Sequence, residues 1–345
     1  MKIGVIGYFG SENVCSDGQS VKTRIIAEEL SRIYPDSVLT YNTLGGVKRI
    51  LYHVFYLCKF TFKCDNIIIL PAHNSLRIFA PILAFLNFFL NRRLHYIVIG
   101  GWLPEFLAKR KWLKKTLLKF NYIYVETSTM KRKLEANGFS NVIIMPNCKD
   151  LSVLSLNQIR DNYTAPYRLC TLSRVIDKKG IEDAINVVKT INEKSNKIVF
   201  QLDIYGPVAD SYENRFAELK RNFPNYISYK GIVPFDKTVE VLKDYFLLLF
   251  PTHYFTEGIP GTILDAYAAG VPVVYSRWVN CADLIADGKE GLGFEFDNYD
   301  EFLKLMFRIS ENPSLIKEMK PNCLNAAMRF TTEKVISTKL LPNLI

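Results

Sequence analysis

The chain has 345 residues, of which 49% are apolar and 23% are charged, and its mean hydropathy is +0.05. This length favours two domains of ordinary size, and the composition is that of a soluble globular protein and excludes a largely disordered chain. The seven cysteines are scattered, with no C-x-x-C pair and no secretory leader, so we expect a reduced, cytoplasmic compartment and no metal site.

The positive charge is concentrated in the first 150 residues, which contain 21 Lys and Arg against 10 Asp and Glu. The net charge of the whole chain is +10, so the remaining residues are close to neutral. Nucleic acid is one acidic partner for such a half, but no recognisable nucleic-acid-binding motif accompanies the charge. Long apolar stretches accompany it instead, so we expect an anionic membrane surface and no nucleic acid.

The first 150 residues alternate short apolar runs with helical stretches, which is typical of a doubly wound parallel sheet. The expected strands are residues 2–6, 38–41, 67–70, 96–99, 122–125 and 142–145. Gly18 precedes the amphipathic run at 21–30 and is a candidate for close backbone approach to a ligand. A glycine after a strand is more often required by a turn, and no G-x-G-x-x-G motif is present.

A first apolar stretch in this half covers residues 78–90 and contains Pro81. Its thirteen residues fall short of the roughly 20 that cross a bilayer. We expect a buried core helix that does not span a membrane, with an interfacial helix as the alternative.

A second stretch, residues 106–120, is basic and amphipathic and has an aromatic anchor. Such a helix lies on an anionic leaflet, where each basic residue contributes roughly 1 kcal/mol. The alternative is a solvated basic face on a helix whose apolar side is core. The residues expected at the membrane are Lys109, Arg110, Lys111, Trp112, Lys114 and Lys115.

The second half repeats the α/β pattern after a polar, non-periodic linker at residues 151–166. Strands are expected at 167–172, 198–205, 226–229, 246–250 and 272–275, and a helix begins near residue 181. We therefore expect α/β domains at 1–150 and 167–329, followed by a helical segment at 330–345.

The stretch at 250–272, FPTHYFTEGIPGTILDAYAAGVP, organises the second domain. A buried strand ends at Phe250, a glycine-rich loop follows, and apolar helical spacing resumes at Ile263. The helix should begin near Gly261 or Thr262, which places free amides at its positive N-terminal end. The groups of this expected anion seat are Gly258, Ile259, Gly261 and Thr262.

Two carboxylates flank the expected anion seat. Glu257 precedes it and Asp265 lies about one turn into the helix, so both should face the crevice at the strand ends. A helix N-terminus suits phosphate and carboxylates suit the hydroxyls of a diol, so together they predict a nucleotide sugar. The alternative is a solvated loop residue and an ordinary first-turn acid.

The pattern E-G-x-P-x-x-x-x-D-A followed by A-G-V-P-V-V resembles the E-x7-E signature of retaining glycosyltransferases of family 4. Asp265 stands where that family more often has Glu. A second element, LSRVIDKKGIEDAI, resembles the segment that carries the family's basic pair. The resemblance implies GT-B architecture, with two Rossmann-like parallel-sheet domains facing each other across a cleft. Residues 330–345 would then cross back onto the N-terminal, acceptor-binding domain.

The resemblance also implies a role for individual residues. Arg174 and Lys179 would clamp the diphosphate of the donor. Glu257 would contact the donor sugar and Asp265 the ribose. Backbone at Gly206 and Val233 would complete the donor site.

The expected reaction transfers a hexosyl unit from a UDP-sugar, or from a GDP-sugar, with retention of configuration. Negative charge develops on the leaving diphosphate, and two cations and the helix amides can stabilise it. The sequence has no D-x-D motif, so we expect no metal and no other cofactor. Family members often have a His or Asp where this chain has residues 100–105, so the acceptor-side group stays open, with Trp102, Glu105 and His73 as candidates.

These features predict a bacterial-type glycosyltransferase that extends a lipid-linked saccharide for a surface polysaccharide such as capsule, on the cytoplasmic face of the plasma membrane. One alternative is a sugar-nucleotide epimerase of the same architecture, whose acid–base groups are hard to find among four histidines. Another is a non-catalytic donor-binding partner subunit, although intact Arg174, Lys179 and Glu257 argue against it.

Overall fold

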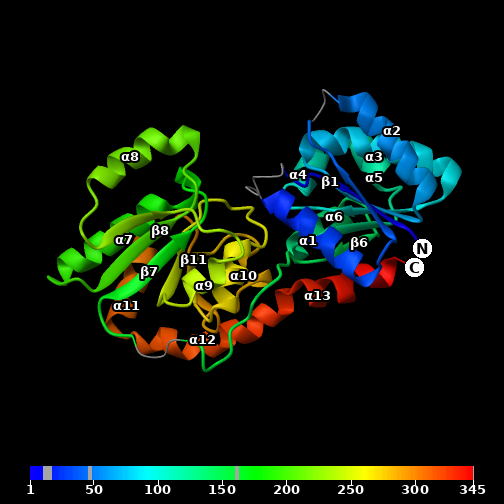
Figure 1. The fold of residues 1–345 in the computed structure, drawn as a ribbon. Helices are drawn as coiled ribbons and strands as arrows, with labels where there is room; N and C mark the ends of the chain where they lie inside the picture. The colour runs from blue at the N-terminus through cyan, green and yellow to red at the C-terminus, as the bar shows by residue number, and fades with distance from the viewer. Residues whose placement is uncertain (11–17, 46–48, 160–162, 345) are drawn as a thin grey trace. The chain divides into compact units, whose positions relative to one another are not determined.

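The computed structural model describes residues 1–10, 18–45, 49–159 and 163–344. The chain divides into two compact units, unit 1 (Met1–Asp150 with Phe330–Ile345) and unit 2 (Leu151–Arg329). The described residues of each unit form one parallel sheet of six strands with helices packed on it (Figure 1). Residues 151–159, expected as a linker, contain no helix or strand and belong to unit 2.

The sheet of unit 1 has the strand order β2-β1-β3-β4-β5-β6. Its strands are β1 (Ile3–Gly7), β2 (Val38–Asn42), β3 (Asn66–Leu70), β4 (Arg93–Ile97), β5 (Tyr122–Val125) and β6 (Val142–Ile144). The order reverses between β1 and β3, and that reversal is the topological switch point at which open α/β sheets bind ligands.

Helices cover both faces of the unit 1 sheet, as its apolar strands require. The helices are α1 (Gly18–Ile33), α2 (Ile50–Lys63), α3 (His73–Leu90), α4 (Leu103–Ala108), α5 (Lys111–Leu117), α6 (Ser128–Ala136) and α13 (Thr332–Val335). Alternate residues of β3 enter opposite cores: Ile68 packs with α1 and the C-terminal segment, whereas Ile67 and Ile69 pack with α2 to α6. Figure 1 shows α1 and α13 on one side of this sheet and α2 and α3 on the other.

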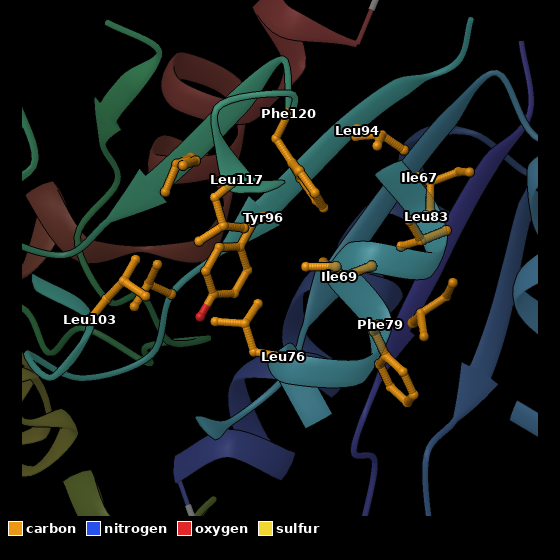
Figure 2. Close-up of a cluster of buried hydrophobic side chains, with 14 of the residues drawn as sticks. Ile67, Ile69, Leu76, Phe79, Leu83, Leu94, Tyr96, Leu103, Leu117 and Phe120 are labelled. Carbon is orange, nitrogen blue, oxygen red and sulfur yellow. The ribbon is translucent and has the colours of Figure 1, made fainter. Parts of the chain in front are cut away.

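The side of α3 that faces the sheet is packed in the core of unit 1. Leu76, Phe79 and Leu83 of α3 belong to one buried cluster with Ile67 and Ile69 of β3 (Figure 2). Leu117 of α5 and Phe120 fill the same cluster. The inner sides of α3 and α5 are therefore fixed by apolar packing.

The sheet of unit 2 has the strand order β12-β11-β10-β7-β8-β9. Its strands are β7 (Tyr167–Leu172), β8 (Phe200–Tyr205), β9 (Ile227–Gly231), β10 (Leu247–Phe250), β11 (Val273–Ser276) and β12 (Gly291–Phe294). The order reverses between β7 and β10, so the loops after these two neighbouring strands meet at the switch point.

The helices of unit 2 pack their apolar sides on this sheet and on one another. They are α7 (Ile181–Lys194), α8 (Glu213–Arg221), α9 (Thr238–Leu242), α10 (Gly261–Ala268), α11 (Tyr299–Glu311) and α12 (Ser314–Ala327). Ile181, Ile185 and Val188 of α7 enter the same core as Phe302 and Met306 of α11. On α10, all residues from Ile263 to Ala268 are buried, and the helix packs against α9 and α12.

Two expectations need correction, and two further features were not expected. The stretch at 78–90 belongs to a longer helix, α3, because a polar first turn before Leu76 hides its true start at His73. Residues 106–120 are not one helix: the chain leaves the α-conformation at Arg110, and this break lets α4 and α5 both reach the core. The segment after residue 330 is helical as expected, but its short α-helix continues as a π-helix at Ile336–Leu340. Strand β12 was not predicted, because its four residues include two glycines.

By length and composition, α3 is long enough to cross a membrane, although the expected thirteen residues were not. Both ends of α3 are tied to the sheet, because β3 and β4 pair in parallel on either side of it in the sequence. Five of its side chains are also buried in the core of unit 1. An insertion across a bilayer would therefore require the sheet to open.

Candidate active site

The predicted donor residues of unit 2 gather at the carboxyl edge of its sheet. Arg174 follows β7, Gly206 follows β8, Val233 follows β9 and Glu257 follows β10. These four strands are consecutive neighbours in the sheet, and all run in parallel. The fold therefore brings the four loops together at one edge, as expected for a ligand site in an open α/β sheet.

An ion pair joins two of the predicted catalytic residues. The Nζ atom of Lys179 lies 2.7 Å from Oε2 of Glu257, and both side chains are mostly buried, at 16% and 19% exposed. Thr252 Oγ1 lies 3.4 Å from the same carboxylate oxygen, and Asn280 donates to the Glu257 carbonyl at 2.6 Å. The carboxylate that was expected to contact a sugar is thus held next to the ammonium that was expected to contact a phosphate.

Two glycines let the loops approach closely. Gly180 has φ +65°, and a Cβ atom there would lie 1.9 Å from the carbonyl oxygen of Pro251. Gly206 has φ +127°, and a Cβ atom there would lie 1.8 Å from the carbonyl oxygen of Ser173. A side chain at either position would force backbone apart, so glycine sets the spacing of these loops. The sequence predicted Gly206 as a ligand-contacting residue, and the structure adds that its close approach to Ser173 requires a glycine.

The start of α10 is as predicted, at Gly261, with Pro260 as the N-cap residue. The first amides of a helix have no intrahelical acceptor, so Gly261 and Thr262 present donors at this end. Thr262 Oγ1 is buried and has no hydrogen-bond partner within the described part of the chain. An orphaned buried hydroxyl beside free amides is a feature that a bound anion or hydroxyl group would satisfy. Asp265 is only 3% exposed, so it lies deeper than Glu257.

The remaining predicted donor residues differ in exposure. Arg174 is exposed, and its guanidinium makes no hydrogen bond or ion pair with any described residue. Val233 is half-buried in the loop after β9, and Gly258 and Ile259 are buried next to Glu257. The free fork of Arg174 is available to an anion at this edge.

A histidine that sequence reasoning did not assign completes the loop after β10. The two ring nitrogens of His253 face two carboxylates, with Nε2 3.1 Å from Asp183 and Nδ1 2.5 Å from Asp297. The hydrogen bond to Asp183, and then the one to Asp297, raises the pKa of His253 to about 9. Its backbone amide donates to the Lys178 carbonyl at 2.9 Å. Protonated His253 therefore ties this loop to the start of α7, which follows Lys179.

In unit 1, the acceptor-side candidates also lie at strand ends. His73 begins α3, three residues after Leu70 at the end of β3, and its ring stacks on Trp102 with centroids 3.8 Å apart. Phe106 packs edge-on against both rings. Burial, and then the nearby Arg110, lowers the pKa of His73, so the imidazole is neutral near pH 7.

Two other candidates of unit 1 stand apart from that aromatic cluster. Glu105 points to Lys133 of α6, with 2.5 Å between Oε1 and Nζ. Gly18 is the first residue of α1 and has open space around its missing Cβ. Residues 11–17 before it, including Cys15, lie outside the described residues.

Metal-binding side chains are not clustered in the ranges that the structure describes. No group of three or more His, Cys, Asp or Glu residues there is arranged to hold a metal ion. The six described cysteines are free thiols, four of them buried.

Comparisons with known proteins relate most of unit 2 to glycosyltransferases. Residues 166–312 match the family model for glycosyl transferases group 1. The amylovoran biosynthesis glycosyltransferase AmsK of Erwinia amylovora is 22% identical over 180 residues, which is 51% of this chain and 43% of AmsK. An uncharacterized glycosyltransferase of Methanocaldococcus jannaschii is 24% identical over 170 residues, or 49% of this chain and 42% of that protein. The chain thus spans less than half the length of these two relatives.

A solved structure resembles the whole chain. HepE from Anabaena, crystallised in complex with UDP, has a TM-score of 0.75 at 14% identity, and the match covers 98% of both chains. A likeness at this identity shows the fold. Together with the two six-stranded parallel sheets, it confirms the predicted two-domain, Rossmann-like GT-B fold.

If His253 is protonated in the folded protein, His253→Gln should change the stability of the protein in a pH-dependent way. Because folding raises the pKa of His253 to about 9, its stabilisation is fully present below about pH 6.5 and is lost as pH rises through 9. Both pairs are partly solvated, so the difference is about 1 kcal/mol or less. Thermal unfolding should show the variant below wild type in mild acid and equal to it in strong base. A constant difference across this range would contradict the assigned charge.

Proposed function

We propose that this chain is a glycosyltransferase that takes its sugar from a nucleoside diphosphate sugar. The observation that carries the proposal is the Lys179–Glu257 ion pair at the switch point of unit 2, at the sheet edge where Arg174 follows β7 and α10 follows β10. This edge offers two cations and helix amides for phosphate, and two carboxylates for hydroxyls. The match of residues 166–312 to glycosyl transferases group 1 supports it, as does the UDP bound to HepE.

The proposed reaction moves a hexosyl unit, with UDP-sugar favoured as donor, and retains anomeric configuration. As the bond to the sugar breaks, negative charge grows on the departing phosphate oxygen and the sugar becomes oxocarbenium-like. The Arg174 fork takes two phosphate oxygens, and Lys179 adds a point charge. In this scheme the acceptor hydroxyl attacks the anomeric carbon on the face that the phosphate leaves, so configuration is retained without a protein nucleophile. The departing phosphate takes the proton of that hydroxyl.

The Lys179–Glu257 pair has a further consequence for this reaction. A diphosphate that approaches Lys179 shares the ammonium with Glu257, and Lys179 has three donors to give. Glu257 then keeps its position while its second oxygen turns to the sugar hydroxyls. Preorganisation of both groups by one contact lowers the cost of ordering them during reaction.

We propose that the acceptor is a saccharide, lipid-linked and destined for a surface polysaccharide, and that it meets unit 1 at the cluster of His73, Trp102 and Phe106. One face of Trp102 is covered by the His73 ring, so a sugar would stack on the exposed side of His73. Glu105 is held by Lys133 and is a weaker candidate for an acceptor-side base. The name of AmsK, an amylovoran biosynthesis glycosyltransferase, supports a polysaccharide context.

The four histidines weigh against a sugar-nucleotide epimerase. His53 and His95 are buried in unit 1, and burial lowers the pKa of His95 to about 3. His73 stacks on Trp102, and His253 is engaged by two carboxylates. None of these imidazoles is placed as a free acid–base group beside Glu257.

The diphosphate clamp can be tested with Arg174→Ala. Loss of a charge-assisted contact that strengthens in the transition state should lower turnover roughly 100-fold or more. The matched control is Arg221→Ala, which removes an exposed arginine from the end of α8 and should leave turnover unchanged. Release of nucleoside diphosphate from a donor panel measures both variants. Normal turnover in Arg174→Ala would remove it from the site.

Metal independence is a separate prediction. If Arg174, Lys179 and the α10 amides offset the leaving-group charge, sugar transfer should continue at an undiminished rate in EDTA. The measurement compares initial rates with and without chelator, followed by added Mg²⁺ or Mn²⁺. A rate that collapses in EDTA and returns with either ion would overturn the metal-free scheme.

Substitutions of Glu257 and of Asp265 should affect different quantities, turnover for Glu257 and nucleotide affinity for Asp265. Glu257→Gln keeps the shape of the side chain but removes the charge next to Lys179, so turnover should fall far more than nucleotide affinity. Asp265→Asn should weaken both UDP and UDP-sugar by roughly 1.5–3 kcal/mol, while the bound complex still reacts. Asn is the first choice because Asp265 is buried, and Ala there adds a cavity.

Calorimetry with UDP on both variants measures the affinities, and thermal unfolding checks that each variant is folded. If Glu257→Gln abolishes UDP binding while Asp265→Asn binds normally, the two roles are reversed.

A further inference from the structure

Helices α2 and α3 of unit 1 expose large apolar side chains on the sides that face away from the sheet. The most exposed are Leu51 at 85% and Phe88 at 81%. We call the following set the aromatic face: Leu51, Tyr52, Phe55, Phe62, Phe85, Phe88 and Phe89. Soluble proteins rarely leave so many large apolar groups together on the surface, and such a patch marks an interaction site.

The residues of the aromatic face lie on one stripe of each helix. On α2 the spacing of 51, 55 and 62 brings these residues to the same side. On α3 the same holds for 85, 88 and 89, and the ring of Phe89 contacts Phe85 and Phe88 edge-on, with centroids 5.6 and 5.2 Å apart. The opposite side of α3 carries the buried Leu76, Phe79 and Leu83 (Figure 2).

The two stripes belong to neighbouring helices on one side of unit 1. Helices α2 and α3 pack against each other on the same face of the sheet. Their C-terminal ends are joined by Arg92, whose guanidinium donates to the carbonyls of Thr61 and Phe62. Helix α5 packs on the other flank of α3 and adds the half-exposed Trp112.

Charge around this surface has one sign. Residues 49–119 contain twelve Lys and Arg but only two acids, Asp65 and Glu105. Both acids are already paired, Asp65 with Arg92 and Glu105 with Lys133. The lysines of α2 and of α5 have no acid in this segment left to pair with. We call them the basic rim: Lys59, Lys63, Lys111, Lys114 and Lys115.

We propose that the aromatic face inserts into the interfacial region of an anionic bilayer, with α2 and α3 lying in the membrane plane and the basic rim contacting lipid phosphates. An apolar stripe with flanking cations is what an interfacial helix requires. A second copy of this chain is a poor occupant, because a symmetric contact would bring two uncompensated basic rims together. This surface is distinct from the donor edge of unit 2, and the inference does not depend on the reaction.

Insertion and electrostatic attraction make different predictions. The phenylalanines should hold the protein on the bilayer after contact, whereas the lysines should bring it there and respond to salt. The sequence alone places the membrane contact on residues 109–115 and keeps an interfacial helix at 78–90 as the alternative. Of these residues, Lys111, Lys114 and Lys115 belong to the basic rim, and the proposed apolar anchor lies on α2 and α3.

The first experiment measures cosedimentation with phosphatidylcholine vesicles, with and without phosphatidylglycerol. Wild type should bind the anionic vesicles, and Phe85→Gln with Phe88→Gln and Phe89→Gln should weaken binding at least about tenfold. The matched control, Leu156→Gln with Ile198→Gln, removes exposed apolar side chains from unit 2 and should bind as wild type. Melting temperatures should be unchanged or higher, because all five side chains are on the surface.

The second experiment replaces Lys111, Lys114 and Lys115 with Gln. At roughly 1 kcal/mol for each lysine, binding to anionic vesicles should fall about 100-fold, without a lower melting temperature. The control, Lys197→Gln with Lys304→Gln and Lys317→Gln, removes the same charge from unit 2 and should change little. Added salt should weaken wild type strongly and the α5 variant only slightly.

A third measurement reports insertion directly. A Phe88→Trp substitution should raise the quenching of tryptophan fluorescence by lipids brominated on the acyl chain above the level that wild type shows, whereas Leu156→Trp should not raise it.

Failure of wild type to bind anionic vesicles would overturn the proposal. Binding that needs the lysines but not the phenylalanines would also overturn insertion. Concentration-dependent self-association abolished by the Phe variant, without vesicle binding, would assign the face to a second copy.

Discussion

The carboxyl edge of the unit 2 sheet depends on the close approach of two loops, the one after β7 and the one after β10. Their strands are neighbours at the point where the sheet order reverses, so the backbone of Gly180 can touch the carbonyl of Pro251. Only a residue without Cβ permits that contact at φ +65°. The same approach brings Lys179 within 2.7 Å of Glu257, so two residues 78 positions apart act as one unit.

Other features of the edge reinforce this arrangement. His253 holds the β10 loop between carboxylates of two other segments, and Gly206 lets the loop after β8 lie against Ser173. The start of α10 then adds free amides and the unpaired Thr262 hydroxyl. An edge that combines cations, amides and carboxylates is suited to a ligand that is anionic at one end and hydroxylated at the other. This is the physical basis for proposing a nucleotide sugar.

Unit 1 has the same sheet architecture, but its helix α3 exposes large aromatic side chains on the surface. Helix α3 serves two purposes, since its inner side fills the core and its outer side exposes Phe85, Phe88 and Phe89. The periodicity of apolar residues could not distinguish the buried side of α3 from the exposed side, because nearly every position from 78 to 90 is apolar. The sequence therefore predicted a buried core helix, which describes only one side of it.

Regular alternation of apolar runs made most of the strands predictable, and a Gly-rich loop before Ile263 located the start of α10. The short β12 was missed, because glycines carry no burial pattern, and the break at Arg110 was missed, because amphipathic spacing continues across it. The His253 contacts were beyond reach for another reason. Asp183 and Asp297 are distant in the sequence and meet the ring only through the fold. Local pattern identifies elements, but it does not identify pairings between loops.

The central claim is that the carboxyl edge of unit 2 binds a nucleoside diphosphate sugar through Lys179 and Arg174. Thermal unfolding in the presence of UDP, GDP, ADP and their common sugars tests it most directly, because a ligand that binds the folded state stabilises it by RT ln(1 + [L]/Kd). At a ligand concentration of about 100 times Kd the gain is about 2.7 kcal/mol, and we predict such a rise for a UDP-sugar with wild type and a much smaller one with Lys179→Ala. If no nucleotide raises the midpoint, or if Lys179→Ala responds as wild type does, the account of this site is wrong.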